Sequence, residues 1–165
     1  MSTCRRWRRK AITSVLFICT GNIFRSMTAE YALRGVAPLA VSSAGLIDAP
    51  HEVLPFVRSH LTGKGVDIAE HQPRRLTQAI LDDADVAVAM GTDHRDHVGE
   101  VHGRDIPLFS EVAFGKSEPL RDVWEVIPDW RNNDAEAHAY AWSLMDRIFD
   151  GMPQFVARME DFVRS

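Results

Sequence analysis

Residues 15–26 read VLFICTGNIFRS and predict a strand, a short loop and a helix in succession. The run at 15–19 is short, apolar and rich in β-branched and aromatic side chains, which is typical of a buried strand. A turn follows at 20–22. From Met27 to Leu33 apolar residues recur with a helical period, and Ser26 is a candidate N-cap. Cys19 therefore ends a predicted strand, and Arg25 stands where a helix begins.

This loop has the residue types of an anion site. A short connection from a strand to a helix turns several backbone N–H groups toward one point, and the helix N-terminus adds partial positive charge. Gly21 permits backbone angles that other residues resist, and Arg25 can donate two hydrogen bonds to phosphate oxygens. Such surroundings favour the thiolate form of a cysteine, so Cys19 is predicted to attack a bound phosphate. The plainer alternative is a small buried core cysteine.

The remainder of the chain alternates predicted strands and helices. Further strands are predicted at 39–43, 85–90 and 106–109, the last at a sheet edge because of Pro107. Helices are predicted at 51–62, 76–81, 92–98 and 134–148, the last resuming after Pro153 up to 163, while 110–133 is mostly loop. This order predicts a single-domain, three-layer α/β fold with a four-stranded parallel sheet. Ligands bind beyond the carboxyl ends of such strands, where Cys19 lies.

The composition excludes several classes of protein. The 165 residues fit one domain, and the two cysteines, Cys4 and Cys19, exclude a disulfide-stapled scaffold. Residues 1–10 hold five basic and no acidic residues, so residues 11–165 hold 14 basic and 23 acidic residues, a net charge of −9. An acidic body excludes a general nucleic-acid binder, which needs a basic face.

The basic residues 1–12 are interpreted as an N-terminal extension that is expected to be disordered, ahead of a domain at 13–165. Weak attachment to an anionic partner is the alternative for this extension. No apolar run reaches the length of a signal-peptide core or of a membrane span. The expected location is therefore the cytoplasm, without stable membrane insertion.

Five ordered motifs resemble the low-molecular-weight protein tyrosine phosphatases. They are VLFICTGNIFRSMTAE at 15–30, SSAG at 42–45, GVDIAEH at 65–71, the predicted strand at 85–90 and VIPDW at 126–130. The resemblance implies a phosphatase that hydrolyses protein phosphotyrosine through a cysteinyl-phosphate intermediate, without metal or cofactor. It also implies a phosphotyrosine-containing protein as substrate, a tyrosine kinase as a further partner, and a monomer or weak dimer.

The resemblance also assigns roles within the loop. Cys19 is implied to be the nucleophile, and Arg25 to bind phosphate and stabilise its oxygens. Asn22 is implied to hold the loop in shape and Ser26 to support the thiolate, while Ser43 and His71 continue that network. Besides Arg25, the implied phosphate-binding loop comprises Thr20, Gly21, Asn22, Ile23, Phe24 and Ser26.

Asp129 is implied to be the general acid, because a phenol leaves more readily when a carboxylic acid protonates its oxygen. Trp130 is interpreted as one wall for an aromatic ring. The family's proline after this aspartate is missing, which shortens the predicted acid loop. Without the resemblance, Asp129 would be an ordinary loop carboxylate. Asp134 is better explained as the N-cap of the last helix.

Several other positions bear on specificity or have a plainer interpretation. Phe24 replaces a second loop cysteine found in many family members and is expected to pack below the loop, while Ile23 is typical of tyrosine-directed members. Trp124 and Trp142 are interpreted as packing residues. The stretch 93–97, which contains His94 and His97, is interpreted as a solvated polar helix start and not as a metal site.

Three alternative functions remain open from the sequence. The same loop would suit an arsenate reductase coupled to a small thiol, a protein phosphoarginine phosphatase, or a non-catalytic phosphate-binding regulatory module. The resemblance favours the phosphotyrosine phosphatase, because the loop and the implied acid are present and Ile23 is typical of tyrosine-directed members.

Overall fold

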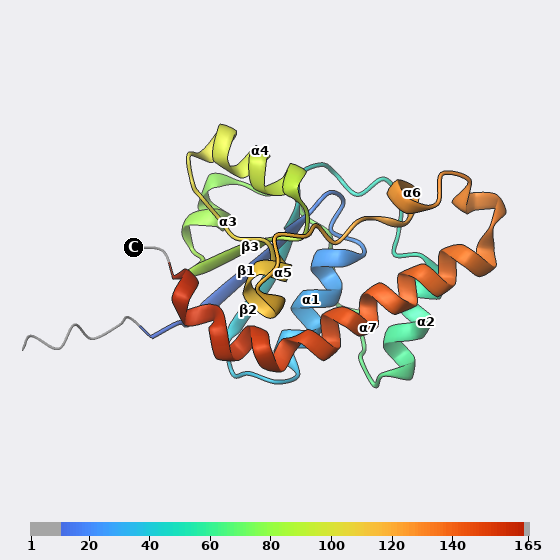
Figure 1. Cartoon of the computed structure of the whole chain (residues 1–165), viewed down its shortest axis with the longest axis horizontal. Helices are drawn as coiled ribbons and strands as arrows, with labels where there is room; N and C mark the ends of the chain where they lie inside the picture. Colours follow the sequence, from blue (N-terminus) through green and yellow to red (C-terminus); the bar gives the residue numbers. More distant parts are fainter. Residues whose placement is uncertain (1–10, 164–165) are drawn as a thin grey trace, which may run out of the picture.

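The computed structural model describes residues 11–163 and has a parallel sheet between two layers of helices (Figure 1). Strands β1 (Ser14–Cys19), β2 (Ala40–Gly45) and β3 (Val86–Ala89) lie in the order β2-β1-β3. In this register Cys19 pairs with Gly45, so both stand at the carboxyl edge of the sheet. The predicted extension at 1–12 lies outside the described residues, except for its last two.

Alternate residues of β1 are buried on opposite faces of the sheet, because successive side chains of a strand point to opposite sides. Phe17 and Cys19 belong to a core with α1 (Arg25–Arg34), α2 (Pro55–Gly63), α5 (Phe109–Phe114) and α7 (Asp134–Arg158). Leu16 and Ile18 belong to a second core with α3 (Gln78–Asp82) and α4 (Thr92–His102). Helices therefore cover both faces, as the alternation of elements predicted.

The fourth strand predicted at 106–109 is wrong, and the described chain forms a three-stranded sheet. A single isolated bridge joins Ala89 to Leu108, with the Ala89 N–H donating to the carbonyl of Pro107 at 2.9 Å. Pro107 has no N–H with which to extend this pairing, and the Leu108 N–H donates to the Glu111 carboxylate at 3.0 Å. That bond caps α5, so a helix begins where the strand would have continued.

The segment 110–133, predicted to be mostly loop, contains most of α5, α6 (Val123–Val126) and the 3-10 helix η1 (Trp130–Asn132). Helix α7 runs through Pro153 without interruption, because Met152 and Phe155 on either side are buried in the core, and η2 (Met159–Phe162) follows it. Among residues 11–163, no helix is both long enough and apolar enough to cross a membrane.

Candidate active site

The loop predicted to bind phosphate leaves β1 at Cys19 and enters α1 at Arg25. Its close approach to β2 requires Gly45, because a Cβ there would lie 2.6 Å from the carbonyl oxygen of Thr20. The left-handed residue of the loop is Asn22, with a φ of 59°, and not Gly21 as the sequence suggested.

Asn22 is buried and ties the loop to its surroundings. Its Nδ2 donates to Ser26 Oγ at 3.0 Å and to Ser43 Oγ at 2.7 Å, and its Oδ1 accepts the Arg74 N–H at 3.1 Å. Its carbonyl accepts a hydrogen bond from Nε2 of His71 at 2.7 Å. Asparagine tolerates the left-handed region better than most residues, and these four bonds hold it there.

The directions of these bonds turn the Ser26 hydroxyl toward Cys19. Ser26 Oγ accepts from Asn22, so its own hydrogen is free to donate to Cys19 Sγ, 2.8 Å away. Ser43 likewise accepts from Asn22 and donates to Glu30 at 3.2 Å. Ser26 therefore directs its hydroxyl hydrogen at the Cys19 sulfur, and it does not cap α1, whose N-cap residue is Phe24.

The loop that follows Cys19 carries several unpaired donors. Within residues 11–163, none of the backbone amides from Gly21 to Ser26 donates a hydrogen bond. The Nε of Arg25 is buried and has no partner among the same residues. Buried donors without partners are rare in folded proteins, and free N–H groups gathered at a helix N-terminus are typical of a phosphate site. This donor set fits an oxyanion.

Arg25 is 2% exposed and is anchored by the segment that leads into α6. Its Nη1 donates to the carbonyl of Leu120 at 2.9 Å, and its Nη2 donates to Asp122 Oδ2 at 3.1 Å. Glu125 lies 3.7 Å from Nη1 and accepts the N–H of Asp122 at 2.6 Å. Leu120 in turn donates its N–H to the carbonyl of Met90, just beyond β3. These contacts place the Asp122 carboxylate beside the loop.

His94, which the sequence suggested to be solvated, is fully buried against the loop. Its Nδ1 accepts the N–H of Gly91 at 2.9 Å, so the proton of the neutral ring is on Nε2, which donates to Thr20 Oγ1 at 2.9 Å. Burial, and next the positive charge of Arg25, lower the pKa of His94 from 6.5 to about 4. The only sequence signal for the burial of His94 against the loop is its position three residues after Gly91, at the carboxyl edge of the sheet.

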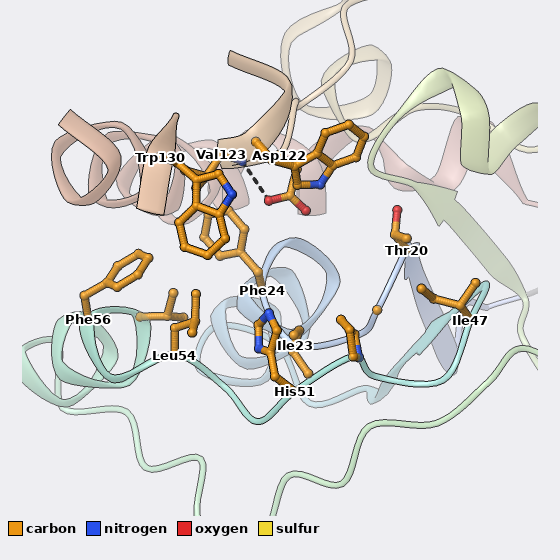
Figure 2. A pocket seen from close by; sticks show the side chains of 14 residues that line it. Thr20, Ile23, Phe24, Ile47, His51, Leu54, Phe56, Asp122, Val123 and Trp130 are labelled. Atoms are coloured by element: carbon orange, nitrogen blue, oxygen red, sulfur yellow. Dashed lines mark hydrogen bonds between the residues drawn. The ribbon is translucent and has the colours of Figure 1, made fainter. Parts of the chain in front are cut away.

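An apolar cavity of about 300 Å³ opens beside the loop (Figure 2). In Figure 2, Thr20 and Ile47 lie at one end, Leu54 and Phe56 lie at the opposite end, and Phe24 lies between them. Among the 14 residues that line the cavity, Asp122 is the only carboxylate, and none is a lysine or an arginine. The cavity therefore suits an apolar group attached to a phosphate in the loop.

Comparison with known proteins identifies the family. Residues 14–125 match the family profile described as low molecular weight phosphotyrosine protein phosphatase. The chain belongs to this family. A probable low molecular weight protein-tyrosine-phosphatase, EpsP of Ralstonia solanacearum, is 31% identical over 124 residues, which cover 72% of this chain and 86% of EpsP. The resemblance inferred from the five motifs is thereby confirmed.

Two solved phosphatase structures share the fold of this low-molecular-weight phosphatase. The tyrosine phosphatase AmsI of Erwinia amylovora has a TM-score of 0.69 at 22% identity, covering 93% of this chain and 95% of AmsI. The arginine phosphatase YwlE of Geobacillus stearothermophilus has a TM-score of 0.73 at 21% identity, covering 90% of this chain and 94% of YwlE. Since their named activities differ, the fold alone does not separate the two substrates.

The structure gathers most of the predicted phosphatase site around the loop but leaves Asp129 outside it. Asp129 is exposed, accepts a hydrogen bond from Asn132 at 2.7 Å, and does not line the cavity. The physical reason is that η1 begins directly after Asp129 and directs the chain toward α7. The family match ends at residue 125, so it includes Asp122 and leaves out Asp129.

The aromatic residues also differ in part from their predicted places. Trp130, interpreted from the sequence as one wall for an aromatic ring, lines the cavity. Trp124, predicted to pack in the interior, is 56% exposed and lines the same cavity. Phe24 packs in the core below the loop and also contributes to the cavity. Trp142 lies on α7, where its Nε1 donates to the carbonyl of Phe56 at 2.9 Å.

Proposed function

We propose that this chain is a cysteine-dependent phosphatase that hydrolyses phosphotyrosine in proteins. The observation that carries the proposal is the Cys19 sulfur, held by Ser26 at the floor of a loop whose amides, with Arg25 Nε, have no partners within residues 11–163. Family membership and the named activity of the relative EpsP support the same reaction. The proposed reaction uses neither a metal nor a cofactor.

The reaction has two displacement steps at phosphorus. In the first, the Cys19 thiolate attacks, an S–P bond forms, and the P–O bond to the tyrosine breaks. The guanidinium of Arg25 and the loop amides stabilise the charge on the transferring oxygens. In the second step, water attacks phosphorus and the S–P bond breaks, which releases inorganic phosphate and restores the thiolate.

We assign the general acid to Asp122 and not to Asp129. The Asp122 carboxylate lines the cavity and lies 3.1 Å from Arg25, so a phosphate bound to this arginine lies next to it. In its acid form Asp122 protonates the leaving tyrosyl oxygen, and the resulting carboxylate then takes a proton from the attacking water. Glu125 accepts the Asp122 N–H and thereby positions this acid.

The apolar cavity supports an aryl phosphate over phosphoarginine. Ile23, Ile47 and Trp124 offer apolar surface beside the loop, which suits an aromatic ring. The guanidinium of phosphoarginine needs hydrogen-bond acceptors, since a buried polar group without partners is costly. Asp122 is the one carboxylate that residues 11–163 contribute to the lining, and it already pairs with Arg25.

Hydrolysis of p-nitrophenyl phosphate, phosphotyrosine and phosphoarginine without added metal tests the proposal. We expect turnover of the two aryl phosphates and its complete loss in Cys19→Ser. Asp122→Asn should lower kcat for phosphotyrosine about 10²–10⁴-fold, the usual worth of general acid–base catalysis. The matched variant Asp129→Asn should stay close to wild type.

Other outcomes of these assays would change the assignment. A large loss in Asp129→Asn alone would return the acid to Asp129. Phosphopeptide binding without turnover would indicate a binding module, and thiol-dependent release of arsenite from arsenate would indicate a reductase.

A further inference from the structure

The cavity beside the phosphate-binding loop is larger than one aromatic ring requires. Its volume is about 300 Å³, about twice the ~150 Å³ of an engineered apolar cavity that binds benzene. Residues of the loop end, Thr20 and Ile47, lie across the cavity from Leu54 and Phe56 (Figure 2). A ring whose phosphate sits in the loop therefore leaves the Leu54 and Phe56 end unfilled.

That second end is apolar and held in place by its neighbours. Leu54 precedes the first residue of α2 and Phe56 lies in its first turn, while Trp130 covers them from η1 (Figure 2). The Phe56 ring stacks on His138 with centroids 4.3 Å apart, and its carbonyl accepts the Trp142 N–H. A preformed apolar surface binds a side chain without the cost of ordering the site first.

Charge distinguishes the occupants that this end can take. Among the described residues 11–163, no lysine or arginine lines the cavity, and Asp122 is at the loop side. Arg131 lies outside the lining and stacks on the Trp130 ring at 4.9 Å. The basic group in this lining is the imidazole of His51, whose Nδ1 bonds to the Glu52 carbonyl at 2.7 Å. An acidic side chain therefore finds no lysine or arginine there, whereas an apolar side chain finds apolar partners.

We propose that the end formed by Leu54, Phe56 and Trp130 binds an apolar side chain that is a sequence neighbour of the phosphotyrosine in the substrate protein. The inference rests on the proposed function, because the loop places the phosphate and the polypeptide continues on either side of the tyrosine. The cavity is continuous from the loop to this end. The substrate class is thus a phosphotyrosine flanked by leucine-like residues.

Three phosphopeptides test this inference, identical except that leucine, serine or glutamate flanks the phosphotyrosine on both sides. We expect kcat/KM of the wild type to be about tenfold higher or more for the leucine peptide than for the serine peptide, which is the usual effect of filling an apolar pocket. Glutamate should be no better than serine. Leu54→Asn makes this end polar and Leu54→Trp fills it, so both should reduce the leucine-to-serine ratio to near one.

The control is Val101→Asn, which makes the same kind of change on α4 at a side chain that is 60% exposed and outside the cavity. It should leave the ratio of the wild type unchanged. Circular dichroism and a thermal melt establish that each variant is folded. Leu54→Asn enlarges the cavity, whereas Leu54→Trp makes it smaller. An effect shared by both therefore comes from this end of the cavity and not from general destabilisation.

Binding to Cys19→Ser protein separates this inference from the proposed function. Fluorescently labelled versions of the three peptides are titrated, so the preference is measured without turnover. If p-nitrophenyl phosphate is not hydrolysed, the proposed function fails, and the binding ratio still decides the inference. Equal affinity and equal kcat/KM for the leucine and serine peptides, a preference for glutamate, or a leucine preference retained in both Leu54 variants would overturn it.

Discussion

Replacing His94 by glutamine should make this protein less sensitive to acid. In the wild type His94 must be neutral, since Nδ1 accepts the Gly91 N–H and Nε2 donates to Thr20. Burial and the charge of Arg25, with a smaller contribution from His97, lower its pKa from 6.5 to about 4, while Asp93 opposes the shift. Protonation would break the bond to Gly91, so the folded state resists it.

The size of the effect follows from this pKa difference. In the unfolded chain His94 takes up a proton near pH 6.5, whereas in the folded chain it does so only near pH 4. Its contribution to stability is therefore present above pH 6.5 and is lost as the pH falls toward 4. At about 1.4 kcal/mol per pKa unit, the loss is about 3 kcal/mol. Glutamine can still donate to Thr20 but leaves the Gly91 N–H unpaired, which should cost about 1–3 kcal/mol at pH 7.

Urea denaturation followed by tryptophan fluorescence at pH 7, 6, 5 and 4.5 measures this prediction. The free energy of unfolding of His94→Gln should lie below that of the wild type at pH 7. Between pH 7 and pH 4.5, the free energy of unfolding of the wild type should fall by about 2–3 kcal/mol more than that of the variant. His97→Gln, on the same helix but without a bond to the loop, controls for the loss of a histidine. A gap for His94→Gln that stays constant with pH would refute the reasoning.

Three further predictions concern the loop. Asn22→Ala loses the side-chain bonds to Ser26, Ser43 and Arg74 at a left-handed position. We expect the free energy of unfolding to fall by about 2–4 kcal/mol, and kcat/KM for p-nitrophenyl phosphate to fall as well. Wild-type values of both quantities would show that these bonds do not hold the loop. Thr20→Val removes the hydroxyl that accepts from His94 Nε2 and should lower the free energy of unfolding by about 1–3 kcal/mol. In a double-mutant cycle, Thr20→Val should lower this free energy only slightly further when His94→Asn is already present. Full additivity of the two losses would show that the two residues act independently. Peroxide should inactivate the wild type with little recovery on thiol treatment, because Phe24 replaces the second loop cysteine; Phe24→Cys should recover a larger fraction of its own activity, and equal recovery would count against the explanation.

Local features of the fold were predictable because they depend on neighbours in the chain. The strand, loop and helix around Cys19 follow from apolar periodicity and spacing over residues 15–33, and β1 and α1 occur there. The fourth strand was not predictable in this way. Its apolar pattern is that of a strand, but the absent N–H of Pro107 and the Glu111 carboxylate, which caps α5, decide against it.

The candidate site likewise has a part that the sequence predicts and a part that depends on the tertiary structure. By itself, the sequence determined the proposed nucleophile, the proposed phosphate-binding arginine and their separation by a tight loop, because Cys19 and Arg25 lie within one strand–loop–helix unit. Only the tertiary structure decided which carboxylate reaches them: Asp122 lies beside Arg25 because Leu120 is bonded to both Arg25 and Met90. It also buried His94, a residue whose polarity predicts exposure, because its two ring nitrogens find partners in segments that only the folded chain brings together.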